Sequence, residues 1–281
     1  MALLNFTLNL VALLLWLGWR ARSVTAMTRP AGIALISTLR RADPTRGKRW
    51  FFPTALGGLL FLRAVLYWEI GPSIHWIPSL SLGATSLPFS SILFGRMLLF
   101  SFLSFGAFFA GFYFWLLLLS ALNQQMTDID PLQNLVRVQL GPLDRSTVAL
   151  KTLLPLLLTT LLWLGLGPLL AWLEINAPAK SFGHVVQQAV VIGVAAMLVW
   201  KYLLVGVLLL HTLATYVYLG NTPFWNFINV TARQLLRPLD RLPLRASKVD
   251  FAPLVGIALV FLMTELLGRW LPKLYEKLPL W

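Results

Sequence analysis

The sequence has no cysteine and few charged residues. The absence of cysteine excludes disulfides, thiolate metal sites and cysteine nucleophiles. Charged residues make up 12% of the 281 residues, whereas hydrophobic residues make up 58%, and the mean hydropathy is +0.76. A chain of this composition has more apolar surface than one soluble core can hide. We therefore expect an integral membrane protein.

Sequence motifs of enzyme chemistry are also missing. The chain contains no phosphate-binding loop, dinucleotide fingerprint, zinc-ligand pair or nucleophile elbow. Its three histidines are His75 and His184, expected in outer loops, and His211, expected within a span. A haem held between helices usually needs two facing ligands, so we favour a packed core or interface role for His211. We expect no enzymatic activity and no cofactor.

Six apolar segments are each long enough to cross a bilayer, since about 30 Å of hydrocarbon takes roughly 20 helical residues. They comprise residues 3–19, 51–70, 90–121, 152–173, 187–219 and 251–270. The first has no basic residue before it and no small-residue cleavage site after it, which favours a retained anchor. The predicted fold is an all-α membrane protein with six transmembrane helices in three helical hairpins.

The hairpins share an order of residues: an apolar helix, a proline, an amphipathic stretch ending in aspartate, and a proline opening the next helix. The three copies are Pro30, Asp43 and Pro53; Pro131, Asp144 and Pro155; and Pro223, Asp240 and Pro253. This order predicts an internal repeat, with a degenerate first unit over residues 1–72 and further units over residues 88–174 and 185–272. Proline suits the first turn of a helix, and Asp250 is placed to cap the helix that Pro253 opens.

The basic residues lie on alternate connections. Residues 20–50, 123–151 and 220–250 hold 16 of the 23 lysines and arginines, and the net charge is +13. The positive-inside rule puts these connections in the cytoplasm and both termini outside, in a multi-pass membrane protein. We expect contact with anionic headgroups of membrane lipids and no nucleic-acid binding, because no recognition module accompanies the basic residues.

The third basic connection has helical periodicity. Its apolar residues recur every three or four positions and exclude Arg233 and Arg237. These apolar residues are Trp225, Ile228, Ala232, Leu235 and Leu236. The pattern predicts an interfacial helix lying flat on the cytoplasmic leaflet with its apolar side toward the lipid. The first connection shows the same pattern less cleanly.

The second and third units resemble a known family. In the third unit the matching residues are Pro223, Asn226, Leu236, Arg237, Pro238, Asp240, Arg241, Asp250, Pro253 and Leu254. In the second they are Asp130, Pro131, Asn134, Gly141, Pro142, Asp144 and Arg145. These motifs are similar to those of the YggT family (Ycf19/YlmG-like) of bacterial and plastid membrane proteins. The resemblance implies a location in the bacterial inner membrane. It also implies roles in membrane-complex biogenesis, in envelope or division processes and in tolerance of osmotic stress.

The aspartates of the two connections have basic neighbours. Asp144 is next to Arg145, and Asp240 is close to Arg237 and Arg241. Such pairs either fix the angle between interfacial helix and hairpin or are ordinary surface pairs worth under about 1 kcal/mol. Both interpretations stay open at the level of sequence.

Five ionisable residues fall inside the predicted spans, where each charge costs roughly 2.5–3.5 kcal/mol or more. They are Arg63, Glu69, Arg96, Lys201 and Glu265. Glu69 and Arg96 lie near outer ends, where snorkelling or mutual pairing accounts for them. For Lys201 we hypothesise a pair with Glu265, the alternatives being contact with another subunit or snorkelling.

The sequence favours a non-enzymatic protein that organises or helps assemble a membrane protein complex, with a role as an accessory subunit among other membrane subunits included in this expectation. The alternative is a small channel or transporter linked to osmotic or ion homeostasis, in which Arg63, Lys201 and Glu265 line a pathway. The two differ in whether these charges meet a hydrated cavity or are sealed in packed pairs.

Overall fold

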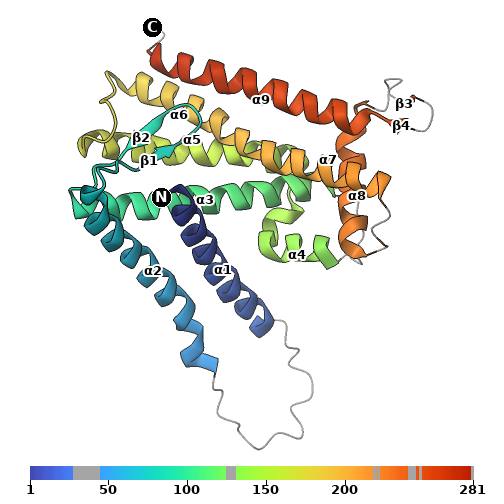
Figure 1. Cartoon of the computed structure of the whole chain (residues 1–281), viewed down its shortest axis with the longest axis horizontal. Helices are drawn as coiled ribbons and strands as arrows, with labels where there is room; N and C mark the ends of the chain where they lie inside the picture. The colour runs from blue at the N-terminus through green and yellow to red at the C-terminus, as the bar shows by residue number, and fades with distance from the viewer. Residues whose placement is uncertain are drawn as a thin grey trace, which may run out of the picture. The chain divides into compact units, whose positions relative to one another are not determined.

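The computed structural model describes residues 1–27, 45–124, 131–217, 220, 222–239, 245–246 and 249–279. The fold is an all-α membrane protein fold (Figure 1), with six helical segments long and apolar enough to span a bilayer. These segments are Ala2–Arg20, Trp50–Ser73, Phe94–Leu122, Val148–Trp172, Phe182–Tyr216 and Ala252–Glu276. The prediction of six membrane-spanning segments is therefore confirmed.

The described helices include long spans and two short amphipathic helices on the connections. The helices are α1 (Ala2–Met27), α2 (Thr45–Ser73), α3 (Phe94–Leu122), α4 (Pro131–Leu140), α5 (Val148–Trp172), α6 (Phe182–Ala196), α7 (Trp200–Tyr216), α8 (Pro223–Leu236) and α9 (Ala252–Glu276), with 3₁₀ turns η1 (Gly141–Arg145) and η2 (Met197–Val199). Two small two-stranded sheets pair β1 (Ser79–Ser81) with β2 (Ser86–Pro88) and β3 (Arg245–Ala246) with β4 (Val249–Asp250).

Only one of the three predicted helix-opening prolines opens its helix. Pro253 is the second residue of α9, as expected, but Pro53 and Pro155 lie inside α2 and α5. The reason in α5 is an earlier start: the side chain of Thr147 accepts a hydrogen bond from the Leu150 N–H and caps the helix. Asp250 is not the cap of α9 either, because Phe251 occupies that position.

The fifth span is one apolar segment made of three elements. Between α6 and α7 the chain tightens into the 3₁₀ turn η2. The carbonyl of Val199 accepts a hydrogen bond from the Trp115 indole N–H at 2.8 Å, and the Trp200 indole donates to the carbonyl of Phe114 at 3.0 Å. These reciprocal bonds hold the turn against α3.

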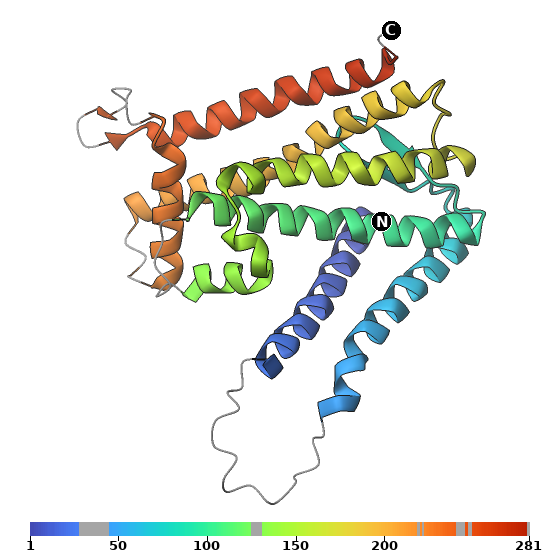
Figure 2. The ribbon, with the colours of Figure 1, turned by 180° about the vertical axis from the view of Figure 1, so that it is seen from behind.

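The contacts divide the chain into two compact units. The first comprises residues 1–80 and 88–109, and the second comprises residues 81–87 and 110–281, so the boundary falls within α3. In the first unit α1 packs along α2 (Figure 2). In the second unit α5 packs on α6 and α7 packs on α9.

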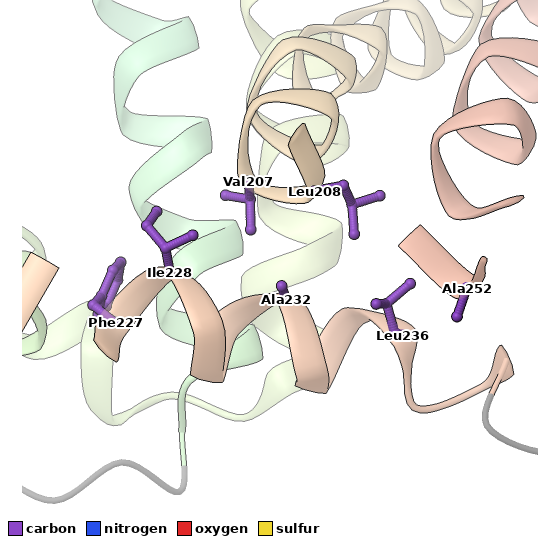
Figure 3. Packing of buried hydrophobic residues seen from close by; sticks show 7 residues of the cluster. All are labelled: Val207, Leu208, Phe227, Ile228, Ala232, Leu236 and Ala252. Atoms are coloured by element: carbon purple, nitrogen blue, oxygen red, sulfur yellow. The ribbon is translucent and has the colours of Figure 1, made fainter. Parts of the chain in front are cut away.

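Within the second unit, α8 runs across the ends of α7 and α9 (Figures 1 and 2). Figure 3 shows Ile228, Ala232 and Leu236 of α8 directed at Val207 and Leu208 of α7. The amphipathic helix is present, but its apolar stripe is buried against protein and does not face the lipid as the sequence suggested. The difference arises because the ends of α7 and α9 offer apolar surface to the same stripe.

Helices α5 and α6 approach each other closely at Gly193. A Cβ atom at this position would lie 2.3 Å from the Thr160 Oγ1 atom and 2.9 Å from the carbonyl oxygen of Leu156. Glycine therefore sets the distance between these two helices, as small residues commonly do between membrane helices.

Candidate functional site

Among the lysines and arginines whose side chains the structure describes, two are almost completely buried, one in each unit. Arg63 of α2 and Lys151 of α5 are each only 1% exposed. Buried cations in membrane-spanning helices are costly and need polar partners. The surroundings of Arg63 and Lys151 are therefore the candidate sites in this protein.

Arg63 is held by neutral oxygen atoms from α1 and α3. Its Nε donates to the Ser101 hydroxyl at 2.9 Å, and its Nη2 donates to the Ser101 carbonyl. Its Nη1 donates to the side-chain oxygens of Asn9, at 2.5 Å, and Asn5, at 3.5 Å. Within the described part of the chain no carboxylate pairs with Arg63, so the charge is stabilised by charge-assisted hydrogen bonds to dipoles.

A second layer of hydrogen bonds orients these acceptors. The amide groups of Asn5 and Asn9 both donate to the Ser104 hydroxyl, at 3.2 and 3.1 Å. The Ser101 hydroxyl donates to the carbonyl of Leu60 at 2.7 Å, and the Tyr67 hydroxyl donates to the Asn5 side chain at 3.4 Å. We call these residues together with Arg63 the arginine cluster; it joins α1, α2 and the first half of α3 within the first unit.

Lys151 lies beside a carboxylate. Its Nζ is 3.9 Å from Asp144 Oδ1, and the Nε of Arg137 is 3.4 Å from Asp144 Oδ2. The Ser120 hydroxyl donates to Asp144 Oδ1 at 2.5 Å. Asp144 thus connects α4, α5 and the end of α3. Asp144 forms its ion pairs with Arg137 and Lys151 and not with the adjacent Arg145, whose side chain is exposed.

The end of α3 also holds the second amphipathic helix. The Asn123 amide donates to the Thr231 hydroxyl of α8 at 2.8 Å, and both side chains are at most 1% exposed. Ser120 and Asn123, one helical turn apart, therefore anchor η1 and α8 respectively. The connection between α3 and α5 and the connection between α7 and α9 are therefore both fixed to the C-terminal end of α3.

The hypothesised pair between Lys201 and Glu265 is absent from the structure. Glu265 pairs instead with Arg269, one turn further along α9, at 2.8 Å. The Lys201 ammonium lies over the ring of Phe261, 4.9 Å from its centroid. Arg96 is half-buried in the first turn of α3, at the end of its span. Glu265 pairs with Arg269 because an i,i+4 neighbour on the same helix is reached without tilting the helices.

The remaining motif residues are mostly structural markers. Pro131 and Pro223 are the first residues of α4 and α8. Asn134, Asn226, Arg237 and Pro238 are exposed, and Pro142 lies in η1. Asp240 and Arg241 lie outside the described residues, and the backbone of Asp250 pairs with that of Arg245 between β4 and β3.

Two of the three histidines have defined partners. The Nδ1 atom of His211 is 2.8 Å from the Asn229 side-chain oxygen, in agreement with a packed core or interface role. His184 does not lie in a loop: it is buried in the first turn of α6 and contacts Gln188 at 3.1 Å. Among the described residues, no group of three or more His, Asp or Glu side chains could hold a metal ion.

The sequence singles out Arg63 and Asp144 but not most of the polar residues around them. These are Asn5, Asn9, Tyr67, Ser101 and Ser104 in the arginine cluster, and Ser120, Arg137 and Lys151 near Asp144. The hydrogen-bonded pair of Asn123 and Thr231 was not predicted either. A signal was present, because Asn5 and Asn9 are four residues apart in an apolar helix, as are Arg63 and Tyr67. Polar residues at this spacing share one helix face.

Comparison with family models, with curated proteins and with solved structures gives no match.

Proposed function

We propose that the chain is a non-enzymatic membrane protein that organises or helps assemble a membrane protein complex through the exposed face of α9. The observation that carries this proposal is an exposed ion pair within a membrane span. The side chains of Glu265 and Arg269 are 60% and 72% exposed. Glu265 stands 13 residues after Ala252, about 20 Å along the helix at 1.5 Å per residue.

An exposed ion pair at this depth is poorly suited to lipid. Charged groups within the hydrocarbon are costly and normally face protein or water. Helices α7 and α6 contact α9, yet its span is the least buried of the six. A polar partner surface would satisfy Glu265 and Arg269 where lipid does not.

The ion pair belongs to a continuous exposed stripe. Residues at three- and four-residue spacing on one side of α9 are Leu254, Ala258, Leu262, Glu265 and Arg269. This spacing is that of a helix-packing seam. The occupant that fits it is a transmembrane helix of another membrane protein, apolar along most of its length and bearing a polar or charged side chain level with the ion pair.

The resemblance to the YggT family supports the same proposal, since it implies a role in membrane-complex biogenesis. With it we propose the bacterial inner membrane as location, with both termini outside and the basic connections facing the cytoplasm. Anionic lipid headgroups and other membrane subunits are the proposed partners.

The arrangement of intramembrane charges favours this proposal over a channel or transporter. Arg63 is enclosed by its hydrogen-bond partners, Lys201 lies over Phe261, and Glu265 is paired on its own helix. A pathway would need such charges to face water.

Site-specific photo-cross-linking in native membranes tests the proposal. A photoreactive residue at Leu262, on the α9 stripe, should capture one defined membrane protein. The matched control at Leu161 of α5, which is 65% exposed, should capture lipid only. The double variant Glu265→Leu/Arg269→Leu, carrying the photoreactive residue at Leu262, should lose the captured protein. Equal capture at both sites, or capture of lipid or of a second copy alone from Leu262, would contradict the proposal.

A further inference from the structure

The turn between α4 and α5 contains a basic cavity, and no residue of α9 lines it. The cavity has a volume of 720 Å³ and is lined by Arg137, Val138, Gly141, Pro142, Asp144 and Arg145. A volume of this size is within the range of small-molecule sites, about 300–1,000 Å³. It is large enough for a phosphate group together with the small alcohol that it esterifies.

The backbone of this turn places Arg137 and Arg145 beside the same cavity. Helix α4 ends at Leu140, and Gly141 turns the chain with φ of +59°, a conformation that favours glycine. The 3₁₀ turn η1 begins at Gly141, has Pro142 as its second residue and ends at Arg145. Arg137 from the last turn of α4 and Arg145 from the end of η1 therefore line one cavity.

The cavity is positively charged. The only carboxylate among its described lining residues, Asp144, already has Lys151 and Ser120 at one oxygen and Arg137 at the other. Arg145 is exposed and forms no ion pair within the described part of the chain. One aspartate therefore faces three cations, and Asp144 fixes the positions of two of them while Arg145 is left to bind an anion.

The position of the cavity relative to the membrane indicates which anion it meets. Arg145 is three residues before Val148, where the α5 span begins. Leu143 and Val148, on either side of Arg145, are exposed apolar residues. A site with a basic centre and an apolar flank at the end of a span lies at the level of lipid headgroups. Arginine there can bind phosphate oxygens through two N–H donors at once.

We propose that the cavity lined by Arg137 and Arg145 binds a phosphate ester, either the phosphate of an anionic lipid headgroup or that of a soluble metabolite. Arg145 supplies the free guanidinium, Arg137 the second donor, and Asp144 positions Arg137 through their ion pair. Phosphate binding is expected here whether or not α9 recruits a partner.

The test measures lipid binding by the purified full-length chain in detergent, using native mass spectrometry with phosphatidylglycerol and phosphatidylcholine as probes. Wild type should prefer phosphatidylglycerol. Arg145→Gln should weaken phosphatidylglycerol binding about tenfold, because a charge-assisted hydrogen-bond pair is lost. The control Arg233→Gln removes another exposed arginine, from α8, and should leave binding unchanged. Because Arg145 is exposed and forms no ion pair with any described residue, its variant should unfold at the wild-type temperature.

A competition arm distinguishes the two sources of phosphate. Displacement of phosphatidylglycerol by millimolar glycerol 3-phosphate supports a soluble phosphate ester, and failure to displace it supports the lipid headgroup. The proposal is overturned if neither phosphatidylglycerol nor glycerol 3-phosphate binds in preference to phosphatidylcholine. It is equally overturned if Arg145→Gln and Arg233→Gln weaken binding to the same extent, since general surface charge then accounts for the attraction.

Discussion

Arg63 and Lys151 are equally buried, but the first is surrounded by neutral oxygens and the second lies beside a carboxylate. The first unit spreads the stabilisation of its cation over two asparagines and a serine. The second unit concentrates it on Asp144. A membrane protein can therefore keep a buried cation either with several weak acceptors or with one strong one, and the two solutions differ in how they fail.

The concentrated arrangement has the larger single-residue dependence. Asp144 contacts Lys151, Arg137 and Ser120, so its loss affects three elements at once. In the arginine cluster, loss of one acceptor leaves the others in place. The comparison predicts a steep cost at Asp144 and a moderate cost at each acceptor of Arg63.

The largest expected effect is that of Asp144→Asn. The amide keeps the shape and the bond to Ser120, but it leaves the Lys151 ammonium buried without a counter-charge. We expect a loss of about 3 kcal/mol in unfolding free energy, at the lower end for breaking a buried pair. Titration with sodium dodecyl sulfate in bicelles, followed by tryptophan fluorescence, measures this loss.

A second substitution isolates the charge. Lys151→Met in the Asp144→Asn background should recover most of the stability, because the uncompensated cation is then gone. Arg145→Gln serves as the matched control and should leave stability unchanged. Additive losses for Asp144→Asn and Lys151→Met would show that the pair is not coupled.

Asn9→Leu examines the distributed arrangement and should have a smaller effect. It removes one acceptor of the Arg63 guanidinium while Ser101 and Asn5 remain. We expect a loss of about 2 kcal/mol, as for one hydrogen bond to a charged group. The same detergent titration applies, and Arg63→Met in the Asn9→Leu background should restore part of the loss. A loss as large as that of Asp144→Asn would remove the distinction between the two units.

A packing substitution provides a reference without charge. In Gly193→Ala the new Cβ meets the backbone of α5 at Leu156, so the two helices must separate. We expect a loss of about 1.5 kcal/mol, typical of overpacking. Gly165→Ala in α5 is the control, since no atom lies within 4 Å of a Cβ placed there. If both variants unfold alike, Gly193 does not set the spacing of α5 and α6.

The sequence predicted the spans better than it predicted their partners. Apolar length alone identifies six crossings, and the motif prolines Pro131 and Pro223 mark the starts of α4 and α8. The buried stripe of α8 was assigned to lipid because periodicity shows that a face is apolar but not what covers it. The start of α5 was not predicted, because Thr147 caps this helix eight residues before the expected proline, Pro155.

The partners of buried charges were the hardest to predict, for a related reason. Arg63 and Asp144 stand out in the sequence because charge in an apolar context is rare. Their partners Ser101 and Ser120 do not stand out, since hydroxyl groups are common in spans and often bond to their own backbone. Which residues meet depends on the rotation of each helix about its axis, and a single sequence does not determine that rotation.

The smallest effect is expected for Glu265→Gln, which removes a charge from the exposed face of α9. Its pair with Arg269 is exposed, and pairs of this i,i+4 kind contribute about 0.3–0.5 kcal/mol. Unfolding of the isolated protein should therefore change by less than about 0.5 kcal/mol. Lys201→Met should add independently, because Lys201 contacts Phe261 and not Glu265. A coupling energy above about 1 kcal/mol in the double variant would show that Lys201 and Glu265 do interact. Independent effects, together with loss of a cross-linked partner, would assign Glu265 to recognition and leave stability to the buried cations.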